Sequence, residues 1–354
     1  MGLRGIAACW IVLGHYKIGE YSDAAWFQAA ISHYYLAVDL FLVLSGFVLA
    51  MTYERRFSGP GAKGAFRRFL LHRLARIYPL YAITTLTCLA LLWFGFEVWG
   101  DPDRGPAGIA ANMLMVQAWW GPYDSFNGPA WSISTEWLAN LLFALFVALL
   151  LQAPGRRAAL VAGAAAALLV GLAFFLGPTP GEKMSAGQIG WYVPPYSLIR
   201  CTTEFMLGIY CWRLRARAGW TRVFGGTAVL LGLLAAVLTA ALVVSVPALD
   251  TLFVLGCCGL ILGLSFERSP VAAALGWAVP AWLGTISFSL YLWHAPLLPL
   301  RQALQDGLTK GGAARPQAVA TAIALAAILA VSSLSYYAVE NPSRRWLRRV
   351  LTPG

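Results

Sequence analysis

Four titratable side chains lie within apolar stretches of the sequence, where an ionisable group is costly. His15, Asp39, Glu136 and His294 each lie in or at the end of a hydrophobic run long enough to form a helix. A charge at mid-membrane costs about 2.5–3.5 kcal/mol on insertion scales, which makes such residues candidates for a functional site. The alternative is a structural role, in which the four residues form hydrogen bonds between helices.

The first apolar stretch carries two groups of different chemistry. Arg4 and His15 are eleven residues apart, which is about 16 Å along an α-helix and about 20° around it. One helix face would therefore present a cation at one level and a base at another. In the alternative interpretation, Arg4 is a flanking topology signal and His15 is a hydrogen-bonded core residue.

Two further stretches carry polar residues at helical spacing. Intervals of three and four residues place side chains on one face of a helix. We expect these faces to point into a helix bundle or a wet cavity, because polar side chains avoid lipid. The two sets are Ser132, Glu136 and Asn140, and Ser287, Tyr291 and His294. In another apolar stretch, Arg200 and Glu204 are four residues apart and are interpreted as an internal ion pair.

A second group of charges is expected at the cytoplasmic surface. Arg73 and Arg76 are one turn apart in HRLARIYP, Arg4 lies at the start of the first apolar stretch, and Glu340 begins ENPSRRW. The guanidinium group suits phosphate because its planar N–H groups pair with two oxygens at once. The alternative is a topology signal with anionic-lipid contact.

The composition defines the class of protein. The chain has 354 residues, of which 59% are hydrophobic and 12% charged, whereas soluble domains carry about 25% charge. We therefore expect one polytopic membrane domain over residues 1–354. The net charge of +11 is explained by the loops that carry it, and no nucleic-acid partner is expected. The six cysteines lack metal-ligand spacing and are interpreted as packing residues, and no metal or bound cofactor is expected.

Hydropathy predicts an all-α bundle of about ten membrane spans. Nineteen of the 26 Lys and Arg residues fall in alternate segments that would share one side, which predicts that both termini are cytoplasmic in a multi-pass cell-membrane protein. This topology places His15, Asp39, Glu136 and His294 in the outer half of the membrane. The aromatic segment 97–130 would be outside, as an interfacial belt or the wall of a substrate site. The predicted spans are 2–16, 34–53, 78–96, 131–151, 158–177, 195–212, 224–245, 251–266, 280–300 and 317–339.

With these residues assembled, the chain resembles the membrane-bound acyltransferase 3 family of O-acyltransferases. The resemblance covers essentially the whole chain and rests on seven stretches in order. It implies a ten-helix bundle that uses cytoplasmic acyl-CoA, most simply acetyl-CoA, to acylate an extracytoplasmic hydroxyl. The stretches are LRGIAACWIVLGH, VDLFLVLSGFVL, HRLARIYP, WSISTEW, RCTTEFMLG, ISFSLYLWHAP and ENP.

The residues and the resemblance together predict acyl transfer from a thioester to an alcohol. His15 would be the general base, because its ordinary pKa of about 6.5 suits proton removal near neutrality. Glu136 or Asp39 would orient the imidazole, as a carboxylate does in a triad. The acceptor would be a glycan or a glycosylated metabolite, and membrane lipids would surround the bundle. The remaining predicted roles are substrate binding, by Arg4, Arg73, Arg76, Ser132, Tyr291, His294 and Glu340.

A second class of function fits the same residues. A proton-coupled transporter or exporter of a lipid-linked sugar or small molecule would also place His, Asp and Glu inside a helix bundle. Inverted repeats, which many transporters have, are not evident in this sequence. Acyl transfer by detergent-solubilised protein, where no gradient exists, would separate the two classes.

Overall fold

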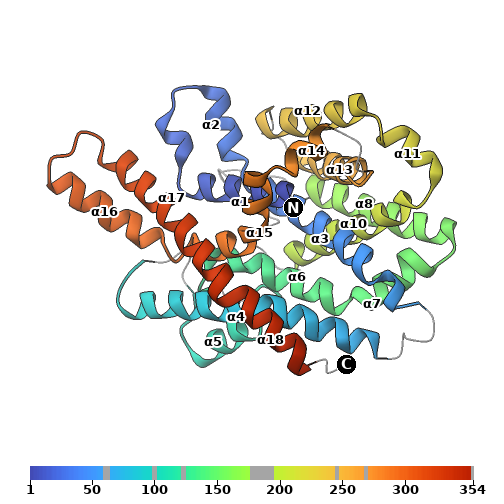
Figure 1. Cartoon of the computed structure of the whole chain (residues 1–354), viewed down its shortest axis with the longest axis horizontal. Helices are drawn as coiled ribbons and strands as arrows, with labels where there is room; N and C mark the ends of the chain where they lie inside the picture. Colours follow the sequence, from blue (N-terminus) through green and yellow to red (C-terminus); the bar gives the residue numbers. More distant parts are fainter. Residues whose placement is uncertain are drawn as a thin grey trace.

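The computed structural model is all-helical over the part of the chain that it describes, and it contains no strand there (Figure 1). It describes residues 1–58, 64–97, 102–120, 125–175, 195–243, 247–266 and 270–351. The α-helices are α1 (Gly2–His15), α2 (Ala25–Ser32), α3 (Leu36–Tyr53), α4 (Ala65–Trp93), α5 (Pro106–Met113), α6 (Trp131–Leu141), α7 (Phe143–Phe146), α8 (Gly155–Phe175), α10 (Tyr196–Arg215), α11 (Ala218–Phe224), α12 (Thr227–Val243), α13 (Pro247–Leu264), α14 (Pro270–Leu275), α15 (Ala278–Trp293), α16 (Leu298–Lys310), α17 (Pro316–Ser335) and α18 (Asn341–Leu351). Short 3₁₀ turns are η1 (Ile18–Tyr21), η2 (Glu54–Arg56) and η4 (Gly128–Ala130), and π-helical turns are η5 (Val147–Gln152) and η6 (Tyr336–Glu340).

Among the residues that the structure describes, four helices are long and apolar enough to cross a membrane. They cover residues 36–56, 65–93, 155–173 and 316–347, and the pair formed by residues 128–141 and 143–152 would make a fifth span with a bend of 57°. The all-helical class and its membrane character are therefore confirmed. The count of ten spans and the cytoplasmic position of both termini stay predictions.

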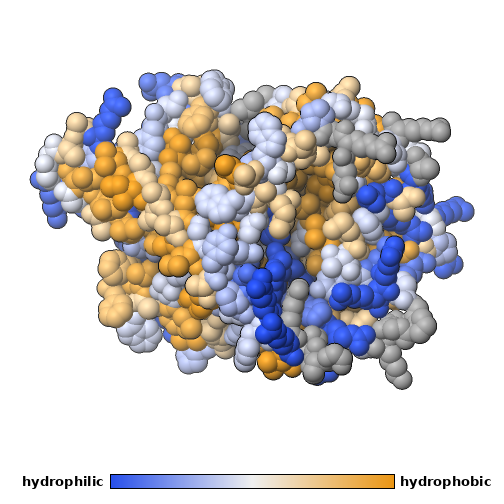
Figure 2. Space-filling model, in the orientation of Figure 1, coloured by the Kyte–Doolittle hydropathy of each residue, from blue (hydrophilic) through white to orange (hydrophobic). Residues whose placement is uncertain are grey.

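Some of the shorter apolar helices correspond to predicted spans. One is α1, whose 14 residues rise only about 21 Å against a hydrocarbon core of about 30 Å. Figure 2 shows hydrophobic side chains across α16, α17 and the adjoining part of α4, and hydrophilic ones gathered over α18. An apolar face of that kind suits contact with lipid.

The predicted start of the third span was wrong. Hydropathy placed it at residue 78, but α4 begins at Ala65 and continues through Pro79 to Trp93. Arg73 and Arg76 were expected at the membrane surface, because a hydropathy profile cannot distinguish an exposed arginine from one inside the bundle. Arg73 is in fact buried, with 8% of its surface exposed. The arginine segment is therefore a rigid helical part of the bundle.

The helices α1 and α15 lie side by side and run in the same direction (Figure 1). Their close approach depends on glycine, because a Cβ on Gly5 would lie 2.5 Å from the backbone nitrogen of Gly284 and 2.6 Å from the Cβ of Leu283. His15 and His294 each follow these glycines by ten residues. Equal rise along two parallel helices brings both histidines to the same level.

The helices α3 and α10 form a second close pair. A Cβ on Gly46 would meet the carbonyl oxygen of Phe205, and one on Gly208 would meet that of Val43. Backbone contact at these points brings the polar residues Asp39 and Arg200 of the two helices within bonding distance.

The aromatic segment predicted outside the membrane is partly helical and packs on the bundle. Tyr81 of α4 donates a hydrogen bond to the carbonyl oxygen of Asn112 in α5, at 2.6 Å. The indole nitrogen of Trp119 donates to the carbonyl oxygen of Ser134 in α6, at 2.9 Å. The segment therefore supports the start of α6, and its position relative to the membrane stays a prediction.

Candidate active site

A cavity of about 190 Å³ lies between α1, α3, α4, α6 and α15. Charged side chains line one part of it, and hydroxyl and aromatic side chains line another. Such a cavity has one region suited to an anion and another suited to a less polar group. Its lining residues are Arg4, Val38, Phe41, Leu42, Leu44, Ser45, Val48, Leu49, Thr52, Tyr53, His72, Arg73, Arg76, Ile77, Ser132, Ile133, Glu136, Ser287, Phe288 and Tyr291.

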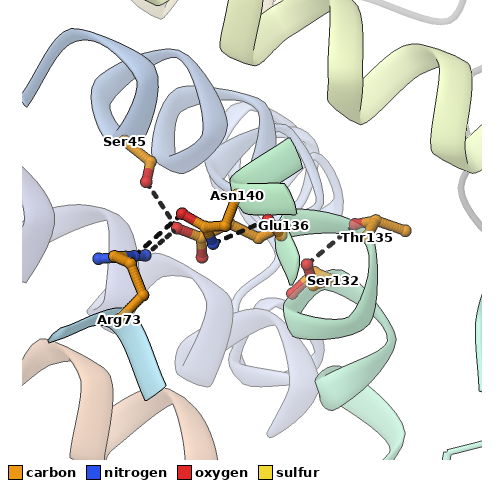
Figure 3. A network of polar contacts seen from close by, with 6 residues as sticks. All are labelled: Ser45, Arg73, Ser132, Thr135, Glu136 and Asn140. Atoms are coloured by element: carbon orange, nitrogen blue, oxygen red, sulfur yellow. Dashed lines mark hydrogen bonds and ion pairs between the residues drawn. The ribbon is translucent and has the colours of Figure 1, made fainter. Parts of the chain in front are cut away.

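An ion pair between α4 and α6 is the centre of a polar network (Figure 3). Nη2 of Arg73 donates to Oε1 of Glu136 at 2.6 Å, and Nε of Arg73 donates to Oδ1 of Asn140 at 3.0 Å. The hydroxyl of Ser45 on α3 donates to the same Glu136 oxygen at 2.6 Å. The predicted stripe on α6 is thus confirmed as one polar face, and Glu136 and Asn140 hold Arg73 in a fixed orientation.

Cations outnumber anions around the cavity. Arg4, Arg73 and Arg76 all line it, whereas Glu136 is the carboxylate among the described lining residues. Nε of Arg4 is buried and has no hydrogen-bond partner within the described part of the chain. An unsatisfied buried donor is costly, so an anionic ligand here would gain a ready partner.

Hydroxyl groups also line the cavity. The hydroxyls of Ser132 and Tyr291 lie 2.7 Å apart, and Tyr291 also donates to the carbonyl oxygen of Pro129 at 2.7 Å. The ring of Phe41 packs against Tyr291 with centroids 6.3 Å apart. Ser132 and Tyr291, predicted to bind substrate, therefore line the cavity from two facing helices.

The two histidines contact each other, and neither is among the lining residues of the cavity given above. Nδ1 of His15 and Nε2 of His294 are 2.9 Å apart, and the two rings are nearly parallel, with 11° between their planes. His294 is fully buried, and its ring centroid lies 5.8 Å from that of Tyr291. The structure thus joins two of the four titratable groups that we expected at one level.

The carboxylates predicted to orient His15 are bonded to other groups. Glu136 accepts from Arg73 and Ser45, and Nε2 of His294 is the atom that lies within hydrogen-bonding distance of Nδ1 of His15. Helical periodicity placed these groups at similar depth, but it could not say which neighbouring helix faces which.

Asp39 belongs to a buried ion triad. Its two carboxylate oxygens accept from Nε and Nη2 of Arg200 at 3.2 and 3.0 Å, and Nε of Arg200 also donates to Glu204 at 3.1 Å. The ion pair predicted between Arg200 and Glu204 is confirmed, with Asp39 as a third member. Because these contacts join α3 to α10, they give Asp39 a structural role.

Glu340 lies in the π-helical turn that follows α17. Its Oε2 accepts from the hydroxyl of Ser289 on α15 at 2.8 Å, and Arg4, Arg76 and Arg344 are the cations whose charge acts on it. It therefore adds a second carboxylate near the arginines without being among the lining residues given above.

Two site residues lacked a chemical role in the sequence analysis. His72 and Ser45 both line the cavity, but each lies next to a more conspicuous residue or motif. The signal for Ser45 was present in VLSGF, where a serine interrupts an apolar run, and His72 directly precedes Arg73.

Comparison with known proteins identifies the class. The chain belongs to the acyltransferase 3 family, whose model, described as an acyltransferase domain, matches residues 2–337. Acyltransferase MdmB of Streptomyces mycarofaciens is 29% identical over 343 residues, covering 89% of this chain and 82% of the relative. The protein named "Putative membrane-bound transacylase BcsY" from Komagataeibacter xylinus is 27% identical over 363 residues, covering 96% of this chain and 81% of the relative.

No solved structure matches this chain. A shorter relative covers part of it. Protein 2 in picA locus, from Rhizobium radiobacter, is 33% identical over 163 residues, which is 40% of this chain and 78% of the relative. The family and the apolar helices together show that the protein is a membrane enzyme that transfers acyl groups.

Proposed function

We propose that the protein is an O-acyltransferase of the cell membrane that moves an acetyl group from cytoplasmic acetyl-CoA to a hydroxyl of an extracytoplasmic glycan or glycosylated metabolite. The observation that carries this proposal is a cavity lined both by arginines and by the hydroxyls of Ser132 and Tyr291. The ring of Tyr291 lies beside that of His294, which contacts His15. One donor molecule could be held by its phosphates and present its acyl group beside the hydroxyls.

The donor is bound through its phosphates. Arg4 offers an unpaired buried Nε, Arg76 lines the same cavity, and Arg73 is held in place by Glu136 and Asn140. Guanidinium groups bind phosphate oxygens bidentately, and a water-poor cavity strengthens this attraction. Glu136 and Glu340 limit the excess of positive charge in the absence of donor.

The acceptor approaches from the side of the histidines. His15 ends α1 and is half-buried, and the exposed Trp120 lies in the aromatic segment that supports α6, with 58% of its surface exposed. Aromatic surface of this kind gives a sugar ring an apolar face on which to pack. The hydroxyl proton passes to His15, which acts as general base.

The transfer balances without any further reactant. The acceptor oxygen forms a bond to the thioester carbonyl carbon while its proton moves to His15, and the carbon–sulfur bond then breaks. The thiolate of CoA takes up the proton from His15, so the products are an ester and free CoA. A positioned base contributes about 10²- to 10⁴-fold to such a reaction.

The test uses the purified full chain in detergent with acetyl-CoA labelled in its acetyl group. Release of CoA thiol and transfer of label are followed with a panel of neutral p-nitrophenyl glycosides and with water as acceptors. We expect thiol release that His15→Ala abolishes. If the folded wild-type protein releases no thiol and transfers no label, then the proposed donor or acceptor class is wrong. Counterflow of a labelled glycoside in proteoliposomes without acyl transfer would support a transporter instead.

A further inference from the structure

The two imidazole rings lie within hydrogen-bonding distance of each other. Nδ1 of His15 lies 2.9 Å from Nε2 of His294, so one of these nitrogens carries the hydrogen and the other accepts it. The other ring nitrogen of His294, Nδ1, is buried and has no hydrogen-bond partner within the described part of the chain.

One combination of tautomers makes His15 a base. With its hydrogen on Nδ1, His294 presents the lone pair of Nε2 to His15 and accepts the Nδ1 hydrogen of that ring. His15 then carries its own lone pair on Nε2, which is the form that can remove a proton.

Both histidines also lie at the carboxyl ends of helices. His15 is the last residue of α1, and His294 follows Trp293, the last residue of α15. The carbonyl groups at a helix end carry partial negative charge that stabilises a nearby cation. Since α1 and α15 are parallel and in register, two such ends meet at this pair.

We infer that His294 is a proton-relay partner of His15, which takes the place of a triad carboxylate and shares the charge that forms when His15 removes the acceptor proton. This inference rests on the proposed function. When Nε2 of His15 receives the acceptor proton, the Nδ1 proton of His15 moves along the hydrogen bond to Nε2 of His294. The positive charge is then stabilised by both helix ends. As the carbon–sulfur bond breaks, the proton returns to Nδ1 of His15 and Nε2 of His15 delivers its own proton to the thiolate.

The relay is tested with three variants of the full-length protein. His294→Gln keeps an acceptor oxygen for Nδ1 of His15 but cannot take up a proton, His294→Glu can do both, and His294→Leu can do neither. Each variant is assayed for CoA thiol release from acetyl-CoA with the glycoside panel, per folded molecule. Folding is measured by monodisperse elution and by CoA binding, which is proposed to depend on the cavity arginines.

The relay predicts a rank order that a merely orienting role does not. We expect about a 10²-fold loss or more for His294→Gln and His294→Leu, and a smaller loss for His294→Glu because its carboxylate can hold the proton. Activity of His294→Gln within about threefold of wild type would overturn the relay and leave His294 an orienting hydrogen-bond partner. If His294→Glu does not fold, the His294→Gln result alone decides.

The two proposals fail in different ways. An inactive wild-type protein would refute the proposed function itself. An active wild type, with His15→Ala inactive and His294→Gln active, would refute the relay alone. The double variant gives a second measurement. When two residues act as one unit, replacing both lowers the activity little more than replacing one of them. We expect His15→Ala combined with His294→Leu to be about as inactive as His15→Ala.

Discussion

Gly5 and Gly284 pack backbone to backbone, and each precedes by ten residues one member of the histidine pair. This contact sets the register of α1 against α15 and so sets the distance between His15 and His294. We expect Gly5→Ala to separate the helices, because its Cβ would lie 2.5 Å from the nitrogen of Gly284. Overpacking of this kind typically costs about 1–3 kcal/mol. The midpoint temperature of thermal unfolding and the specific activity should both fall.

Gly163 of α8 provides the matched control. A Cβ there would have no neighbour within 4 Å, and alanine favours a helix interior by about 1 kcal/mol over glycine. Gly163→Ala should therefore leave activity unchanged and stability equal or higher. Full specific activity in folded Gly5→Ala would show that the register of α1 tolerates displacement.

His15→Ala should abolish acyl transfer while leaving membrane insertion and CoA binding nearly intact. The arginines proposed to hold the donor line a cavity whose lining residues do not include His15, and removal of a general base costs about 10²- to 10⁴-fold. Specific activity per folded molecule is the deciding measurement. A histidine that served only packing would give a less stable protein whose folded fraction is fully active.

Replacement of the cavity arginines should weaken the donor complex. We expect Arg76→Ala to raise the Kd for acetyl-CoA at least tenfold. Arg76→Lys should recover only part of the lost affinity, because an ammonium group cannot pair bidentately with phosphate. Isothermal titration on purified protein measures both. Arg157→Ala, at an exposed position of α8, is the control for loss of one positive charge. An unchanged Kd in Arg76→Ala would leave that residue only its role in topology.

Arg73 should behave differently from Arg76. Its ion pair with Glu136 is largely buried, with 10% and 18% of the two side chains exposed. Removal of one partner of such a pair leaves an uncompensated charge, which costs about 3–5 kcal/mol when burial is complete and less here. Arg73→Ala is therefore expected to lose stability as well as CoA affinity. Thermal unfolding with and without acetyl-CoA separates the two losses.

Asp39→Ala should damage stability rather than chemistry. Its removal leaves Arg200 with Glu204 as the remaining carboxylate of the triad, and loss of a fully buried partner costs about 3–5 kcal/mol. Asp306→Ala, at an exposed position of α16, is the control. A folded Asp39→Ala protein with normal stability but no activity would restore the catalytic role first predicted for Asp39.

The predicted topology can be tested by labelling single cysteines in a background without the six native ones. Trp120 and Arg56 both lie on the surface, and the distribution of cations predicts opposite sides for them. Trp120→Cys should react with a membrane-impermeant maleimide added outside intact cells, and Arg56→Cys only after permeabilisation. The reverse pattern would invert the orientation and place the histidine pair on the cytoplasmic side.

The sequence by itself determined which ionisable residues lie within apolar helices. Helical spacing alone predicted the polar face of Ser132, Glu136 and Asn140 and the ion pair of Arg200 with Glu204. Residues three or four positions apart are neighbours on a helix whatever surrounds it. The apolar stretches likewise predicted the all-helical membrane class, because the bilayer requires long apolar helices.

Only the tertiary structure decided which of these residues are partners. The predicted depths placed Asp39, Glu136 and His294 at the level of His15, but they could not say which of them faces it. Contacts between helices assigned Arg200 to Asp39, Arg73 to Glu136 and His294 to His15. Such assignments depend on close approach at small residues such as Gly5 and Gly284, whose effect spans 279 residues of sequence. Local periodicity carries no information about contacts of that range, because they arise only when helices distant in the chain pack together.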